Sequence, residues 1–496
     1  MGIVQRDSIR ITIISYIGAA IGYFNKILLF PNFLSVEEVG LANILINIAT
    51  VYAQFAALGM PGVTLKFFPY FNDKQRQHHG FLFWTSFISL LGFMIVTLLF
   101  VLFQSSVVSY YSERSPLLVE YIFYLIPLGL ATLFYTLFET YLRSLMKTIV
   151  STLVNEIVLR LMVTLSISLY ALKLVTFHEF VIIYVGVNCL AAVILLVYMA
   201  YLKQLLFKPE WSTTTKRFFH IILNFGFYSV LGNMSYILVS NIDSMMVASM
   251  VGLKETGVYT TIFFIATVMI IPYRSITRVA SPLVAQFWKK RKLDEMHSLY
   301  KKVALLNIII GCLLFLGIWV NMDNLFSFMP KEYAQGKYVF LFLGLGRLFD
   351  MATGINGFIL VTSKKYRYDL FFALLLIGLT IGLNYFLIPL YGIIGASIAT
   401  MCTLVIINLF RILFILFAFK MQPFDMRSVA VMLVGMAVYG IQYFIPPLFN
   451  VYADLILRSA LCLVLFVIPI MLLKLSPETN EYIKKLLGYA GIKITL

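Results

Sequence analysis

Charged residues are scarce in this chain, and their scarcity excludes a soluble fold. Only 12% of the 496 residues are Asp, Glu, Lys or Arg, whereas 61% are hydrophobic, and the mean hydropathy is +0.93. Soluble domains carry about 25% charged residues and are less than half apolar. A chain of this length could not bury so much apolar surface in its own core, so we expect its helices to be surrounded by lipid.

Cysteine and histidine are also rare, which excludes several kinds of site. The four cysteines and five histidines are scattered, so the sequence offers neither a disulfide framework nor a zinc site. It contains no glycine-rich loop of the P-loop type, and no catalytic constellation stands out. We therefore expect neither an enzyme nor a bound cofactor. Energy for any transport would have to come from a proton or sodium gradient, or from removal of the cargo.

Long apolar runs dominate what is present. A helix needs about 20 mostly apolar residues to cross a bilayer, and the sequence offers about fourteen such runs. The first six are expected near residues 9–30, 40–65, 81–103, 118–142, 148–170 and 178–203. The others are expected near 218–245, 255–280, 302–321, 337–361, 368–388, 391–419, 428–447 and 453–474. The basic start of the chain is interpreted as part of the first helix, not as a cleaved signal.

The basic residues between these runs predict the orientation. Alternate loops are crowded with Lys and Arg, as in the run Lys289–Lys292, whereas the opposite loops hold only Arg114, Lys173, Lys254, Lys331 and Lys337. By the positive-inside rule, the crowded side and both termini are cytoplasmic. This bias and attraction to anionic lipid explain the net charge of +16 better than nucleic-acid binding does. We expect a multi-pass protein of the bacterial cytoplasmic membrane.

A weak internal repeat occurs at an offset of 217 residues. The segment Glu38–Leu41 aligns with Glu255–Val258, and Ile48–Val51 is identical to Ile265–Val268. Because the match pairs the second predicted span with the eighth, each repeat would contain six helices in the same orientation. The spans after the twelfth would then be an addition to the repeated part.

The repeat predicts an all-α integral membrane fold with two pseudo-repeated six-helix lobes. The predicted parts are an N-terminal lobe (1–208), a C-terminal lobe (209–422), two further helices (423–475) and an amphipathic cytoplasmic tail (476–496).

Polar residues recur at helical spacing inside several spans. The second span carries Asn43, Asn47, Thr50 and Gln54 on one face. Similar stripes follow in the seventh span (Ser229, Asn233, Tyr236, Ser240, Asp243) and the eighth (Thr260, Thr267, Arg274, Arg278). These stripes predict a polar cavity shared by the two halves. The alternative is hydrogen bonding between helices in a dry bundle.

Basic residues outnumber acidic ones within the spans, which predicts an anionic cargo. An unpaired cation in low dielectric attracts a counter-ion. Glu156–Arg160 and Arg347–Asp350 are expected to pair at helical spacing. The predicted substrate-binding residues are Lys26, Asn43, Asn47, Gln54, Arg160, Asn233, Arg274 and Arg347. Asp243 and Asp350 are the candidates for ion coupling, although Asp243 could instead be a structural acid facing a basic neighbour.

One segment points to a known family. Residues 384–400, Asn384-Tyr-Phe-Leu-Ile-Pro-Leu-Tyr-Gly-Ile-Ile-Gly-Ala-Ser-Ile-Ala-Thr400, resemble a recurring segment of bacterial polysaccharide flippases. The Asp243 helix followed by Glu255-Thr-Gly-Val-Tyr259 is similar to the start of that family's second half. The family is the Wzx-type group of the multidrug/oligosaccharidyl-lipid/polysaccharide exporter superfamily. Physically, Pro389 and Gly392 would turn the chain into a helical hairpin.

The resemblance implies two lobes around a central cavity that work by alternating access. It implies carriage of a polyprenyl-pyrophosphate-linked oligosaccharide, such as an O-antigen, capsule or exopolysaccharide unit, from the inner to the outer leaflet. It also implies membrane lipids, a polysaccharide polymerase and other assembly proteins as partners, and no nucleic acid. The motifs are structural, so three alternatives stay open: a multidrug extruder of the same superfamily, an integral-membrane polymerase or glycosyltransferase, and a structural partner of a biosynthetic complex.

Overall fold

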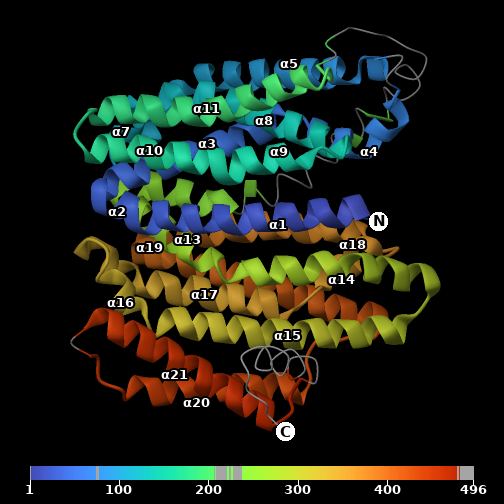
Figure 1. The fold of residues 1–496 in the computed structure, drawn as a ribbon, viewed down its shortest axis with the longest axis vertical. Coiled ribbons are helices and arrows are strands. Elements are labelled where there is room, and N and C mark those ends of the chain that lie inside the picture. Colours follow the sequence, from blue (N-terminus) through green and yellow to red (C-terminus); the bar gives the residue numbers. More distant parts are fainter. Residues whose placement is uncertain are drawn as a thin grey trace. The chain divides into compact units, whose positions relative to one another are not determined.

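The computed structural model describes residues 2–73, 77–205, 207, 221–222, 225–226, 237–238, 240–448, 450–476 and 480. Within these residues the ordered elements are helices, and there are no β-strands (Figure 1). The prediction of an all-α membrane fold is thereby confirmed. The chain divides into two compact units, Met1–Thr261 and Ile262–Leu496, which are described separately.

Unit 1 is built from the N-terminal helices and the start of α13. Its first elements are α1 (Gly2–Tyr23), the π-helical turn η1 (Phe24–Leu29), α2 (Phe30–Phe33), α3 (Val36–Ala56), α4 (Met60–Phe71), η2 (Gln77–Gly80) and α5 (Phe81–Leu102). They are followed by α6 (Gln104–Ser112), α7 (Pro116–Glu120), η3 (Ile122–Tyr124), α8 (Leu125–Ser144), α9 (Thr148–Leu153), the π-helical turn η4 (Val154–Val158), α10 (Leu159–Ala171) and α11 (Phe177–Tyr201). Residues 240–250 are helical and lead into α13 (Leu253–Thr267).

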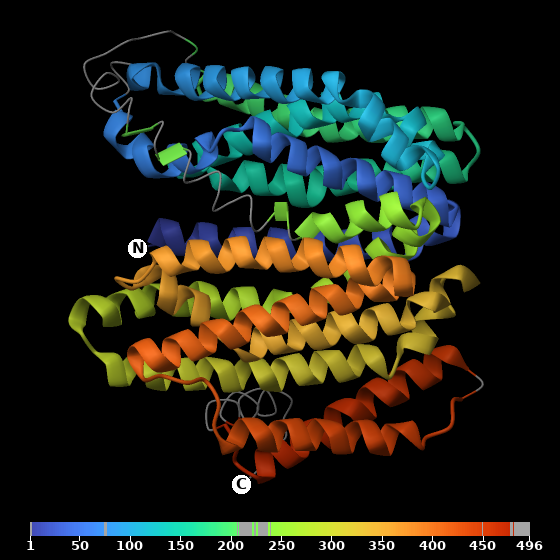
Figure 2. The ribbon, with the colours of Figure 1, turned by 180° about the vertical axis from the view of Figure 1, so that it is seen from behind.

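Unit 2 holds the end of α13 and the C-terminal helices. Its further elements are α14 (Ile270–Lys290), α15 (Leu293–Trp319), α16 (Met322–Phe326), η5 (Lys331–Gly336), α17 (Lys337–Ala352), α18 (Asn356–Thr362), α19 (Arg367–Phe419), α20 (Met426–Tyr443) and α21 (Val451–Leu472). The last two helices pack against each other and against α15 (Figure 2).

Side-chain caps explain where several helices begin. Ser35 accepts from the backbone N–H of Glu38, whose carboxylate accepts in return from the Ser35 N–H. Thr176 and Glu179 form the same capping box at α11. Each box satisfies amide groups that the first helical turn leaves without partners. Because loops in this chain are short, such caps define where one span ends and the next begins.

Helix α19 contains the predicted hairpin. A single straight helix of its 53 residues would be about 80 Å long, far more than a bilayer needs. At Gly392 the backbone leaves helical geometry, with φ 57° and ψ −134°. A Cβ atom on Gly395 would overlap the carbonyl oxygen of Leu387, so the chain folds back on itself with no room for a side chain. The turn predicted at Gly392 is confirmed.

Ten helices among the described residues are long and apolar enough to cross a membrane, or up to twelve when two bent pairs are each counted as one span. The bent pairs are α13 with α14 and η5–α17 with α18, with bends of 46° and 49°. The predicted span at 218–245 lies largely outside the described residues, so the total of fourteen stays a prediction. The lobe boundaries at 208 and 422 also stay predictions, and most of the predicted tail helix, 477–479 and 481–496, is not described.

Candidate functional site

Lys26 is the best-defined cation of unit 1. It lies in η1, inside the candidate span Ile13–Phe33. Its Nζ donates a hydrogen bond to Asn43 Oδ1 of α3 and lies 4.4 Å from the centre of the Phe30 ring. Asn43 Nδ2 in turn donates to Thr260 Oγ1 of α13, at 2.9 Å. We call Lys26, Asn43 and Thr260 the Lys26 cluster.

The Lys26 cluster has positive charge without an acidic partner. Within the described part of the chain, no carboxylate lies at ion-pair distance from the Lys26 ammonium, which contacts an amide oxygen and an aromatic face. Both stabilise a cation only weakly compared with a carboxylate. In a low-dielectric surrounding such a group attracts an anion. The arrangement can therefore hold one negatively charged group, such as a phosphate.

Two π-helical turns lie in the helices beside this cluster, η1 against α10 and η4 against α1. Asn25 of η1 donates from Nδ2 to the carbonyl oxygen of Arg160, at 2.9 Å, and its Oδ1 accepts from Thr164 Oγ1, at 2.8 Å. The second turn, η4, ends two residues before Arg160 and packs on α1. A π-helical turn inserts one residue into a helix and is frequent at functional sites. Here the two turns position the side chains next to Lys26.

Arg160 is bound within its own helix pair. Its Nη2 lies 2.6 Å from Glu156 Oε2, and its Nη1 donates to the carbonyl oxygen of Gly18. The predicted Glu156–Arg160 pair is confirmed. A Cβ on Gly18 would lie 2.5 Å from the Glu156 carbonyl oxygen, and one on Gly22 would lie 2.6 Å from Arg160 Nη1. The spacing of these two glycines, four residues apart, is the sequence signal for such close helix packing.

The polar face predicted on α3 is present, and its first residues bond to neighbouring helices. Asn47 Nδ2 donates to Ser244 Oγ at 2.8 Å, as Asn43 does to Thr260. Thr50 donates to the Ile46 carbonyl oxygen of its own helix, and Gln54 is half-buried. These bonds are of the kind that the dry-bundle alternative expects. Asn233 lies outside the described residues.

Asp243 is buried near the start of the helix formed by residues 240–250. Its side chain is 2% exposed, and Oδ2 accepts a hydrogen bond from the Tyr259 hydroxyl at 3.1 Å. Tyr259 follows α13's first turn and is itself buried. The role of Asp243 in ion coupling stays a prediction.

The charged residues predicted in unit 2 do not pair as expected. Arg347 lies over the Phe263 ring, 5.4 Å from its centre. Asp350 Oδ1 instead accepts from Asn408 Nδ2 at 2.9 Å. The predicted Arg347–Asp350 ion pair is therefore wrong. The amide of Asn408 in α19 also accepts a hydrogen bond from Asn356, at 2.8 Å. Asn356 begins α18, directly after the break from α17. The Asn408 amide therefore bridges Asp350 and Asn356 across this break.

The predicted site residues thus fall into separate groups. Lys26, Asn43, Asn47, Gln54, Arg160 and Asp243 belong to unit 1, and Arg274, Arg347 and Asp350 belong to unit 2. Arg274 is exposed on α14. Asn25, Thr164 and Asn408 were missed, although an amide or hydroxyl inside an apolar span is itself a signal.

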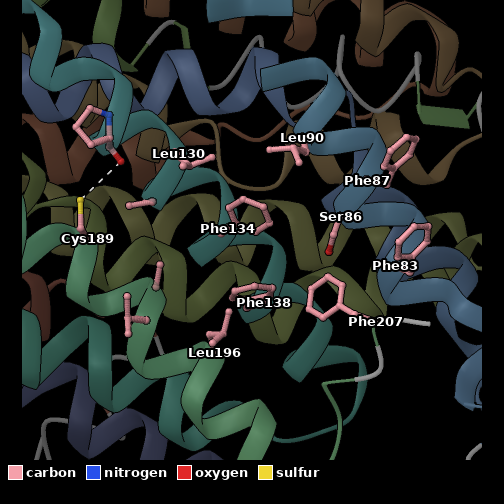
Figure 3. A pocket seen from close by; sticks show the side chains of 14 residues that line it. Phe83, Ser86, Phe87, Leu90, Leu130, Phe134, Phe138, Cys189, Leu196 and Phe207 are labelled. Carbon is pink, nitrogen blue, oxygen red and sulfur yellow. Dashed lines mark hydrogen bonds between the residues drawn. The ribbon is translucent and has the colours of Figure 1, made fainter. Parts of the chain in front are cut away.

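An apolar cavity of about 600 Å³ lies elsewhere in unit 1, between α5, α8 and α11 (Figure 3). Phe83 and Phe87 line it from α5, Phe134 and Phe138 from α8, and Cys189 from α11. Cys189 Sγ lies 3.6 Å from the Pro127 carbonyl oxygen. Its lining includes no charged side chain, so this cavity suits hydrocarbon and not a phosphate.

Comparisons with known proteins agree on the fold. The lipid II flippase MurJ, solved in an inward closed conformation, superposes with a TM-score of 0.70 at 15% identity, covering 93% of this chain and 97% of that one. An inward-facing multidrug resistance MATE family transporter of the MOP superfamily gives 0.61 at 13% identity, covering 84% and 98%. These similarities confirm the expected transporter fold.

Sequence comparisons agree on the family. The capsular polysaccharide biosynthesis protein CapF of Staphylococcus aureus is 24% identical over 184 residues, 37% of this chain and 46% of that protein. The match thus spans less than half of that relative's length. The MatE family model matches residues 228–386. The model of the polysaccharide biosynthesis protein family matches residues 4–288, more than half of the chain, and this chain therefore belongs to that family.

Proposed function

We propose that this protein is a flippase, and not an enzyme, that moves a polyprenyl-pyrophosphate-linked oligosaccharide from the inner to the outer leaflet of the cytoplasmic membrane by alternating access. The observation that carries the proposal is Lys26, a cation inside a membrane span with no acidic partner among the described residues. Charges at this depth are rare and mark substrate pathways. A pyrophosphate is the anionic group that a polysaccharide-family cargo would bring to it.

Each part of the site has a role in this proposal. Lys26 of unit 1 attracts the pyrophosphate and any acidic sugars, and Arg274 and Arg347 of unit 2 are separate candidates for the same role. Asn43, Asn47, Gln54 and Asn233 offer hydrogen bonds to glycan hydroxyls, which lose water on entering the membrane. The prenyl chain stays in the surrounding lipid. Asp243 and Asp350 would couple the cycle to a proton or sodium gradient.

Arg160 has a structural role in this proposal, although its charge alone would suggest cargo binding. Its guanidinium is already neutralised by Glu156 and bonded to Gly18. A cation that is paired in this way has little attraction left for a second anion. We therefore assign Arg160 chiefly to holding α1 and its π-helical turn, and thus Lys26, in place.

The names of the relatives support the proposal at the level of cargo class. One is a capsular polysaccharide biosynthesis protein and another is a lipid II flippase. A polymerase and other assembly proteins of the same membrane are the partners that this function would need.

The direct test is mass spectrometry of polyprenyl-linked intermediates after depletion of this protein in its own host. We expect a complete, unpolymerised repeat unit to accumulate on its lipid carrier, facing the cytoplasm. Accumulation of short chains facing outward would instead place the protein after the flipping step and would overturn the proposal. The same measurement identifies the glycan.

A multidrug extruder is the second candidate, because the MatE model matches residues 228–386 and MATE transporters share the fold. Its cargo would have to pass the Lys26 ammonium, which has no acidic partner among the described residues and repels cationic drugs. Depletion that leaves lipid-linked intermediates unchanged but makes cells sensitive to toxic cations would favour this candidate.

A further inference from the structure

The apolar cavity between α5, α8 and α11 is lined by one buried hydroxyl group, that of Ser86 in α5. The side chain is 5% exposed, and among the described residues its Oγ atom has no hydrogen-bond partner. Figure 3 shows this hydroxyl among the aromatic rings that line the cavity. The neighbouring Thr85 donates to the carbonyl oxygen of Phe81, a bond that hydroxyls in helices can form. A buried hydroxyl without a partner is unfavourable, so a ligand with an oxygen acceptor would supply the missing bond.

The cavity has the length of one lipid leaflet. Its lining on α8 runs from Pro127 to Phe138, and this part of the helix rises about 16 Å. Half of a hydrocarbon core is close to the same distance, since the whole core is about 30 Å thick. All three helices belong to candidate membrane spans, and the exposed lining residues, such as Phe87 and Val193, are apolar. The open side of the cavity therefore adjoins hydrocarbon.

The polar end of the cavity lies near the beginning of α5. Ser86 follows Phe81, the first residue of this helix, at a distance of about 8 Å along the helix axis. The headgroup region on each side of a bilayer is about 5–8 Å deep. Ser86 therefore lies close to the depth at which headgroups meet hydrocarbon, where the ester carbonyls of phospholipids are found.

A cation is present at the same end. Lys203 lies in the sequence between two lining residues, Leu196 of α11 and Phe207, and its side chain is exposed. In the predicted orientation this end is cytoplasmic, and the cytoplasmic leaflet carries anionic headgroups that attract Lys and Arg. The charge of Lys203 therefore suits the phosphate of a lipid in that leaflet.

We propose that this cavity binds one anionic phospholipid of the inner leaflet. An acyl chain of the lipid lies between α5, α8 and α11, its ester carbonyl accepts a hydrogen bond from Ser86, and its phosphate lies beside Lys203. The prenyl chain of the proposed cargo fits less well, because a prenyl chain has no acceptor atom and leaves the Ser86 hydroxyl without a partner. The inference does not depend on the proposed function, since this lipid is resident and is not the cargo.

The test compares two lipids that differ only at the acceptor. The full-length protein is purified in detergent, stripped of lipid and titrated with dioleoyl phosphatidylglycerol or with its diether analogue, which has the same headgroup and chains but no ester carbonyl. Native mass spectrometry measures the bound lipid. We expect one tightly bound diester lipid and several-fold weaker binding of the diether. Equal affinities for the two lipids would overturn the proposal.

Two variants and a matched control locate the site. Ser86→Ala should abolish the preference for the diester lipid, because the donor is removed. Ala131→Phe should weaken the binding of both lipids several-fold, because the ring fills the cavity that Ala131 lines. The control is Ser89→Ala in the same helix, whose hydroxyl donates to the Ala57 carbonyl oxygen at 3.4 Å and lies outside the lining; both affinities should stay unchanged. Undiminished binding by a folded Ala131→Phe variant would place the lipid elsewhere and overturn the proposal.

A polyprenyl phosphate tests the competing occupant. If it displaces the phospholipid from the parent protein at equal concentration, and Ala131→Phe abolishes its binding, the cavity is the site of the cargo's chain and the proposal is overturned. These measurements involve no transport, so their outcome is independent of the depletion experiment that tests the proposed function. Should Ala131→Phe fail to elute as a folded protein from gel filtration, the comparison of diester and diether lipids still decides the question.

Discussion

At the scale of a single residue, Lys26 shows how function can be inferred from a charged group whose burial in the membrane is energetically unfavourable. An ammonium group within a membrane span loses hydration, and only a counter-charge restores most of that free energy. Here the group has an amide oxygen and a ring face as its neighbours. A protein that required only packing at this position would have an apolar side chain there.

Replacing Lys26 by Met should therefore impair transport more than folding. Charge-assisted hydrogen bonds contribute about 1.5–3 kcal/mol, so we expect translocation to fall by about 10- to 100-fold. The thermal midpoint should stay within a few degrees of the parent, because the removed bond to Asn43 is compensated by relief of the buried charge. Turnover of lipid-linked intermediates and thermal unfolding in detergent measure the two effects.

The control for Lys26→Met is Lys66→Met in α4. Lys66 is also cationic and lies 3.8 Å from the centre of the Phe225 ring, but outside the Lys26 cluster. Equal loss of transport in both variants would show that net positive charge matters and not the position of Lys26.

Substitutions at Glu156 and Arg160 should, in contrast, impair folding more than transport. Glu156→Gln leaves the guanidinium without its carboxylate, and since both side chains are about one quarter exposed, we expect a loss of about 1–2 kcal/mol in stability. The double variant Glu156→Gln/Arg160→Gln should regain part of this loss because no unpaired charge is left. Thermal unfolding of the two variants tests this, and a single variant as stable as the parent would mean that solvent screens the pair.

At the scale of elements, the hairpin of α19 depends on one backbone conformation. Gly392 has φ 57° and ψ −134°, a combination that residues with a side chain rarely adopt. No atom lies within 4 Å of a Cβ added there, so the cost of a substitution is conformational and not steric.

Gly392→Ala should consequently lower stability by about 1–3 kcal/mol. The matched control is Gly382→Ala in the same element, where a Cβ is equally free of contacts but the backbone is helical; it should be neutral or slightly stabilising. Thermal unfolding of both variants gives the comparison. Equal midpoints would show that the turn can relax into another conformation.

Sequence patterns predicted these elements unevenly, for physical reasons. Hydropathy located the spans, and Pro389 with Gly392 located the hairpin, because lipid and backbone sterics act on local sequence. The π-helical turns at Asn25 and Glu156 could not be predicted, since one inserted residue barely changes the apolar pattern. The predicted Arg347–Asp350 pair was wrong because spacing along one helix shows only which residues can meet. Asp350 bonds instead to Asn408 of α19, a residue far away in the sequence.

The candidate site, too, could be predicted from the sequence only in part. The surplus of cations and the polar face of α3 were visible in the sequence, and Thr260 belonged to the polar stripe predicted in the eighth span. Whether an amide faces a cavity or a neighbouring hydroxyl depends on the packing of other helices, which the pattern of α3 alone does not contain. The same holds for Arg160, whose charge was visible but whose contact with Gly18 was not.

At the scale of the whole molecule, the direction of transport depends on the orientation of the chain in the membrane. The exposed side chains of Arg114 and Lys173 lie in loops predicted to be outside, and those of Arg291 and Lys364 lie in loops predicted to be cytoplasmic. The orientation follows from the asymmetry of Lys and Arg between these two sets of loops.

Single cysteines at these four positions test the orientation in a variant without native cysteines, of which Cys312 and Cys462 are buried. A membrane-impermeant maleimide added to intact spheroplasts should label Arg114→Cys and Lys173→Cys at once. Arg291→Cys and Lys364→Cys should be labelled only after permeabilisation, since their loops face the cytoplasm. The reverse pattern would place both termini outside, and the inward-to-outward direction of the proposed transport would then have no support from the charge asymmetry of the loops.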